Sequence, residues 1–119
     1  MQRLRSFSFA WAGLRYLIAS EHNARVHLAA TVAVVTSAIL LRADTTQCLF
    51  LVVAVGWVWF AEAMNTAVER LADAVTLEHH PQIRIAKDVA SAAVLIASIV
   101  SAITGLAIFV PLILRLMYP

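Results

Sequence analysis

Four polar residues with the chemistry to bind a cation follow a long apolar run: Glu62, Asn65, Glu69 and Asp73. Their spacings of three, four and four place the three carboxylates nearly in line along a helix, with the amide beside them. Like charges one turn apart repel, and carboxylates beside hydrocarbon are costly to keep. A chain that retains this row is expected to bind something positive with it, and we predict a divalent metal ion carrying phosphates.

The elements that must position this row are membrane-spanning helices. Of the 119 residues 62% are hydrophobic and only 13% are charged, which is far from the composition of a soluble domain. Apolar runs predict spans at residues 26–41, 48–64 and 89–114, and the second helix is expected to continue through the acidic row. We therefore expect an all-α integral membrane protein.

The first 20 residues are predicted to form a helix that does not cross the membrane. Phe7, Trp11, Leu14 and Ile18 recur at helical spacing with arginines among them, which is typical of an amphipathic helix on the membrane surface. The same periodicity is equally compatible with a helix that packs only against the rest of the protein.

The distribution of basic residues predicts how the chain is oriented. With three spans, the N-terminal segment and residues 62–88 share one side, which carries seven Lys and Arg residues against two on the other. The positive-inside rule places the N-terminus and the acidic row in the cytoplasm, where ATP is available, and the C-terminus outside. Because the basic residues are scattered and the net charge is only +2, we do not expect nucleic acid as a partner.

The charged groups expected at the cytoplasmic face suit phosphoryl transfer. Carboxylates would hold Mg²⁺, cations such as Lys87 would bind phosphate oxygens, and Glu62 at the membrane edge would act as base for a lipid alcohol. Without a glycine-rich phosphate loop, side chains and metal would have to hold a nucleotide. A solvated charged loop is the plainer interpretation of the same composition.

Three ordered blocks of sequence resemble the prokaryotic diacylglycerol kinase family, which includes undecaprenol kinases. The blocks are WAGLR at residues 11–15 with Glu21 downstream, EAMNTAVE at residues 62–69 followed by Asp73, and AKDVASAAVLI at residues 86–96. The resemblance implies one lipid-kinase domain over residues 1–119, with a surface helix at residues 1–20 and three spans. It also implies a homotrimer of the bacterial inner membrane, with active sites shared between neighbouring protomers.

The resemblance further implies a role for each matching residue. Glu62 would take the proton from the lipid hydroxyl, Asn65 would help to hold substrate and phosphate, and Glu21 and Glu69 would bind Mg²⁺ and through it ATP. The other expected ATP contacts are Phe9, Glu78, His79, His80, Lys87 and Asp88. The residues expected near the lipid are Phe7, Trp11, Arg15, Glu62 and Ser91.

The residues leave the lipid substrate open between two primary alcohols. Diacylglycerol, giving phosphatidic acid, is the first expectation; undecaprenol is the alternative, and His80-Pro81 looks somewhat more like the undecaprenol kinase branch. Outside this class, a small membrane transporter usually needs its acid deep within a span, whereas here the acids gather at one edge. A non-catalytic membrane scaffold would leave the acidic row and Lys87-Asp88 unexplained.

Overall fold

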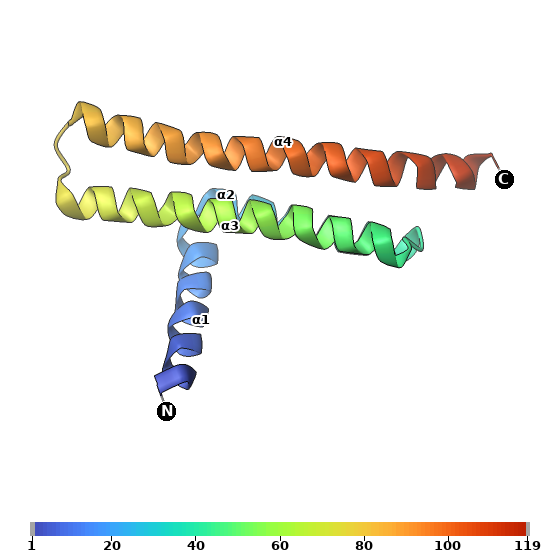
Figure 1. Ribbon diagram of the computed structural model, residues 1–119, viewed down its shortest axis with the longest axis horizontal. Helices are drawn as coiled ribbons and strands as arrows, with labels where there is room; N and C mark the ends of the chain where they lie inside the picture. Colours follow the sequence, from blue (N-terminus) through green and yellow to red (C-terminus); the bar gives the residue numbers. More distant parts are fainter. Residues whose placement is uncertain (1, 119) are drawn as a thin grey trace.

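Four helices make up the structure, a computed structural model that describes residues 2–118 and the side chains of residues 6–118. They are α1 (Gln2–Ser20), α2 (His22–Leu40), α3 (Thr45–Val75) and α4 (Pro81–Met117). The long α3 and α4 lie antiparallel, α2 runs beside α3, and α1 leaves the bundle crosswise (Figure 1). The predicted all-helical fold is confirmed.

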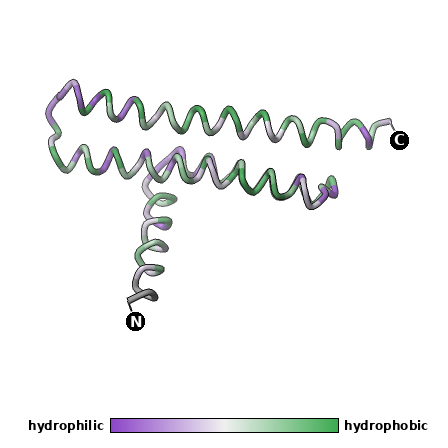
Figure 2. The backbone as a smooth tube through the Cα atoms, in the orientation of Figure 1, coloured by the Kyte–Doolittle hydropathy of each residue, from purple (hydrophilic) through white to green (hydrophobic). Residues whose placement is uncertain are grey.

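The three helices from α2 to α4 are each long and apolar enough to cross a membrane. Figure 2 shows hydrophobic residues along most of α3 and α4, with hydrophilic ones near the α3–α4 loop and at the opposite ends of these helices. Large apolar side chains face outward on all three, as expected where lipid rather than water is the solvent. The chain is therefore a membrane protein.

Small side chains lie at the interface where α3 and α4 pack against each other. Ala97 of α4 is 1% exposed and packs with Ala61 and Val58 of α3, with Val94 at the edge of this cluster. In lipid, where apolar surfaces gain little from meeting one another, small residues allow the backbones close enough for tight van der Waals packing. This contact fixes the register between the acidic row on α3 and the facing turns of α4.

The turn between α2 and α3 is held by caps at both helix ends. Arg42 adopts a left-handed φ of 53°, and its neighbour Ala43 donates to the Ala38 carbonyl at 2.9 Å, which closes α2. Asp44 then caps α3 by accepting from the Gln47 amide, while the Gln47 side chain accepts from the Asp44 amide. The chain can therefore reverse at this end within residues 41–44.

The helices differ in length, and this difference leaves a step in the bundle. At about 1.5 Å per residue, the 19 residues of α2 span about 28 Å, close to the thickness of a bilayer core. The 31-residue α3 and 37-residue α4 continue beyond the start of α2. The chain turns from α1 into α2 at this step, next to the acidic row.

Candidate active site

The acidic row faces a cavity of about 320 Å³ between α2, α3 and α4, which we call the acidic pocket. Glu62, Asn65 and Glu69 enter it from α3, one turn apart, and Ser91 enters it from α4. The three residues that share one helix face by their spacing in the sequence thus form one wall of a cavity. The full lining is Asn23, Val26, His27, Glu62, Asn65, Glu69, Ser91, Val94, Leu95 and Ser98.

Hydrogen bonds orient the central side chain of this wall. Ser91 Oγ donates to Asn65 Oδ1 at 3.4 Å, and Asn65 Nδ2 donates to Glu69 Oε1 at 3.3 Å. The amide therefore lies between the hydroxyl from α4 and the carboxylate from its own helix. Asn65 is 8% exposed, so its orientation is set by these two bonds and by packing.

Glu62 is the most deeply buried ionisable group among the described side chains. It is 2% exposed, and its Oε2 accepts no hydrogen bond from residues 6–118. The imidazole of His27 on α2 lies nearby, with its Nε2 3.5 Å from that oxygen. A buried carboxylate at the end of a cavity has the surroundings expected of a proton acceptor.

A second cavity of about 400 Å³ lies where α3 and α4 are joined, and we call it the loop pocket. It brings together Glu78, His79, His80, Lys87 and Asp88, all of which the sequence analysis associated with ATP. The wall is built from the end of α3, the loop and the first two turns of α4. The remaining lining residues are Asp73, Thr76, Leu77, Ile83 and Arg84.

Ion pairs arrange the charges of the loop pocket. Lys87 Nζ donates to Asp73 Oδ1 at 2.9 Å, and Arg84 Nε lies 3.8 Å from Asp88 Oδ2. Both pairs are exposed to solvent, so each contributes little to folding. Their cations remain available to phosphate oxygens at the water-facing end of the row.

Glu21 approaches the site from the junction of α1 and α2. Its Oε1 accepts a hydrogen bond from Arg70 Nη2 at 2.6 Å, and the guanidinium of Arg70 also lies over the Tyr16 ring, 5.4 Å from its centre. Arg70 therefore ties α3 to the end of α1. Sequence reasoning did not predict this role; the one signal was the position of Arg70 directly after Glu69.

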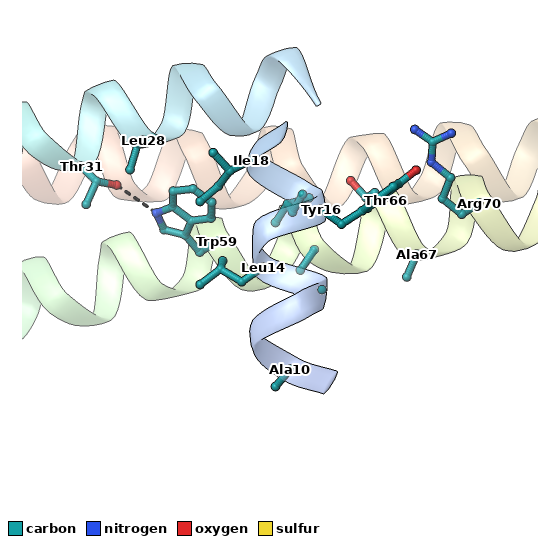
Figure 3. Close-up of a pocket in the computed structure, with 13 residues that line it drawn as sticks. Ala10, Leu14, Tyr16, Ile18, Leu28, Thr31, Trp59, Thr66, Ala67 and Arg70 are labelled. Atoms are coloured by element: carbon teal, nitrogen blue, oxygen red, sulfur yellow. Dashed lines mark hydrogen bonds between the residues drawn. The ribbon is translucent and has the colours of Figure 1, made fainter. Parts of the chain in front are cut away.

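The third cavity, of about 760 Å³, is lined mainly by apolar side chains and lies between α1, α2 and α3 (Figure 3). Leu14 and Ile18 of α1 face it opposite Leu28 of α2 and Trp59 of α3. At one side Trp59 Nε1 donates to Thr31 Oγ1 at 2.9 Å. Other polar groups at its wall are Tyr16, Thr66 and Arg70.

The predicted residues of α1 lie apart from these cavities. Phe7, Phe9, Trp11 and Arg15 are exposed and line none of the three. The structure thus gathers Glu62, Asn65, Glu69 and Ser91 in one cavity and the loop residues in another. It does not bring the aromatic side chains at the start of α1 to either of them.

The carboxylates near the acidic pocket are candidate ligands for a magnesium ion. Within the described residues no three His, Cys, Asp or Glu side chains form a metal cluster. Mg²⁺, however, is commonly held by one or two carboxylates together with water and substrate phosphates. Glu69, which is partly exposed and engages Asn65 through one oxygen, fits such an arrangement, and Glu21 is a second carboxylate nearby.

Comparison with known proteins shows the family to which the chain is similar. A profile of the prokaryotic diacylglycerol kinase family matches residues 8–109. A diacylglycerol kinase of Synechocystis is 39% identical over 115 residues, which cover 96% of this chain and 66% of that relative. The chain thus spans just under two thirds of that protein's length.

Two other relatives match over most of their own length. The undecaprenol kinase of Bacillus subtilis is 34% identical over 107 residues, covering 90% of this chain and 87% of the relative. The diacylglycerol kinase of Escherichia coli is 35% identical over 101 residues, covering 85% of this chain and 83% of the relative. The aligned stretches are long enough in each case to include most of the helices described above.

Proposed function

Since this chain belongs to the prokaryotic diacylglycerol kinase family, we propose that it transfers the γ-phosphoryl group of ATP to the hydroxyl of a membrane lipid. The observation that carries this proposal is the acidic pocket, in which Glu62, Asn65 and Glu69 face Ser91 beside the apolar spans. The carboxylates lie beside the apolar spans, where a lipid hydroxyl would be, and the cations lie near the α3–α4 loop, where the phosphates of ATP would be.

In the proposed mechanism Glu62 is the general base. Its carboxylate accepts the proton of the lipid hydroxyl while the alcohol oxygen attacks the γ-phosphorus, and ADP leaves with the electrons of the broken P–O bond. Asn65, held by Ser91 and Glu69, orients the reacting groups through its amide. Lys87 stabilises negative charge on the phosphoryl group as it moves. Positioning of the reactants supplies much of the rate.

The nucleotide is proposed to lie across the loop pocket and the acidic pocket. Its base and sugar would contact Glu78, His79 and His80, and its phosphates Lys87 and Asp88. Glu69 and Glu21 would hold Mg²⁺, which neutralises phosphate charge when bound. For this Glu21 would exchange its present partner, Arg70, for the metal. Phe9 would stack near the nucleotide.

A homotrimer with shared active sites is part of the proposal. Phe7, Phe9, Trp11 and Arg15 are exposed on α1, far along the chain from the acidic row. A neighbouring protomer is the simplest means of joining this end of α1 to an acidic pocket, and outward-facing apolar side chains on α2–α4 offer contact area. Lipid contacts would then come from α1, Glu62 and Ser91.

The proposed location is the bacterial inner membrane. The N-terminus and the loop pocket would face the cytoplasm and the C-terminus the outside, in accordance with the distribution of Lys and Arg. Helix α1 would lie on the cytoplasmic surface, because it leaves the bundle crosswise at the step where α2 begins.

A glutamine substitution tests the general base. Glu62→Gln is expected to lower turnover by a factor of about 10²–10⁴ and leave ATP binding close to wild type, because it removes a proton acceptor but keeps the side-chain volume. Asp44→Asn, at the distant turn between α2 and α3, is the matched control and should retain activity. Near-normal turnover in Glu62→Gln would disprove the assignment.

Competing lipids distinguish the two substrates. Diacylglycerol is proposed first, and undecaprenol is equally supported by the relatives. Incorporation of ³²P from labelled ATP into each lipid, offered at equal concentration in one detergent preparation, gives the preference directly. ATP turnover that persists without any lipid alcohol would instead favour a transporter and count against a kinase.

A further inference from the structure

The most deeply buried carboxylate of the acidic pocket has a close imidazole neighbour, and that neighbour comes from a different helix. Glu62 Oε2 lies 3.5 Å from His27 Nε2, and the His27 side chain is only 18% exposed. Among the side chains of residues 6–118, this is the one close contact between an acidic and a basic group of α2 and α3 in which both side chains line the acidic pocket. In low dielectric such a pair interacts more strongly than it would in water.

The backbone around His27 is fixed to α3 by a chain of hydrogen bonds. Trp59 Nε1 donates to Thr31 Oγ1 at 2.9 Å, and that hydroxyl donates to the His27 carbonyl at 2.7 Å. Trp59 lies one turn before Glu62 on the same helix. The turn of α2 that carries the imidazole is therefore held in register with the turn of α3 that carries the carboxylate.

The charges around Glu62 give His27 a specific task. Glu69 on the same helix and Glu21 before α2 are both acidic, and the described lining of the acidic pocket includes no Lys or Arg. From α4 the pocket receives only uncharged groups, among them Ser91 and Ser98, and none of the described side chains of α1 lines it. Among the described residues that line the pocket, His27 is thus the one that can place a positive charge close to Glu62 when its ring is protonated.

We propose that His27 is a positioning residue for the phosphoryl transfer: it holds the Glu62 carboxylate through Oε2 and keeps it ionised, leaving Oε1 for the proton of the lipid hydroxyl. This inference rests on the proposed kinase function and deepens it. A protonated imidazole 3.5 Å from Oε2 favours the ionised carboxylate through its charge.

The first test is the pH dependence of turnover in His27→Gln. We expect kcat to fall by about 10-fold or more at neutral pH and the acidic limb of the pH–rate profile to move toward higher pH, because the base loses its cation. The KM for ATP should stay near wild type. His22→Gln, an exposed imidazole at the start of α2, is the matched control and should keep the wild-type profile.

A second test does not depend on activity. A hydrophobic carbodiimide reacts with protonated carboxyl groups in apolar surroundings, so the modification of Glu62 at a series of pH values, read by mass spectrometry, reports its ionisation. At neutral pH we expect several-fold more labelling of Glu62 in His27→Gln than in wild type or His22→Gln. Equal labelling in all three proteins would overturn the inference.

The two tests separate this inference from the function on which it rests. If Glu62→Gln is inactive while His27→Gln keeps both the wild-type profile and the wild-type labelling, the kinase assignment stands and the role of His27 is wrong. If the wild-type protein phosphorylates no lipid alcohol, the proposed function is wrong, and the labelling still decides whether His27 controls the ionisation of Glu62.

Discussion

Two glutamates on α3 show how burial gives different roles to identical side chains. Glu62 is 2% exposed and has an oxygen without a hydrogen bond from the described residues, whereas Glu69 is partly exposed and shares one oxygen with Asn65. A sequestered carboxylate suits proton transfer, and one open to water suits a hydrated cation. Two turns of helix thus separate a proposed base from a proposed metal ligand.

A prediction at this scale concerns Glu69→Gln. The substitution keeps the shape of the side chain but removes the charge that would attract Mg²⁺, so the Mg²⁺ concentration for half-maximal activity should rise by about 10-fold or more, in keeping with the loss of one carboxylate ligand. A metal titration of kinase activity measures this. An unchanged titration, with Asp44→Asn as control, would contradict the metal role.

At the scale of elements, α1 is fastened to the bundle at its C-terminal end. Leu17 is 4% exposed, and Arg70 joins this end through Glu21 and the Tyr16 ring. The preceding residues carry large exposed aromatic side chains. Attachment at one end is what a helix needs if it is to adapt its other end to a membrane surface or to a neighbouring protomer.

The two contacts of Arg70, with Glu21 and with the Tyr16 ring, predict the effect of Arg70→Ala. Without the guanidinium, the ion pair to Glu21 directly after α1 and the stacking on Tyr16 within α1 are both lost, and backbone amides near residues 14–20 should exchange several-fold faster with deuterium. Arg70→Lys should be intermediate, because it keeps the charge but not the planar group. Arg84→Ala removes an ion pair within α4 and serves as the control. Equal exchange in all variants would show that Arg70 does not hold α1.

A second prediction at this scale concerns the bond between α2 and α3. Thr31→Val removes the acceptor for Trp59 and should lower the free energy of unfolding by about 0.5–1.5 kcal/mol, the range for polar contacts between membrane helices. Thr104→Val is the control, since that hydroxyl bonds only a carbonyl of its own helix. Denaturation in mixed micelles measures both, and equal losses would assign no stability to the bond between helices.

At the scale of the whole molecule, shared sites predict complementation between variants. Arg15→Ala and Glu62→Gln are each expected to be poorly active, but mixed trimers would contain some sites with an intact α1 from one protomer and an intact Glu62 from another. Co-expression should therefore restore measurable activity above the sum of the separate variants. If each site is built from one chain, the mixture will show no such gain.

The sequence predicted the helices well, because a chain in lipid must satisfy its backbone within each segment. Long apolar runs and the spacing of Glu62, Asn65 and Glu69 are local signals, and both survive in the structure. Most of the predicted site residues line two cavities, which form because α4 runs back antiparallel along α3. The short polar loop between these helices favours that arrangement.

The contacts that could not be predicted are those between helices. His27 with Glu62 and Arg70 with Glu21 depend on how each helix is rotated and shifted against the next. Between α2 and α3 the register coincides with the hydrogen bond from Trp59 to Thr31, two residues that look in sequence like those of any other membrane helix. Periodicity identifies the face of a helix but does not identify the partner of that face.

The step left by the short α2 has a consequence for the membrane itself. Because α2 is about as long as a bilayer core is thick and α1 leaves crosswise at its end, we expect the thickness of the surrounding bilayer to determine the depth of Glu62. A thicker bilayer would draw the acidic row toward hydrocarbon, and a thinner one would leave it in water. Lipid phosphorylation would then respond to acyl-chain length in the surrounding membrane as well as in the substrate.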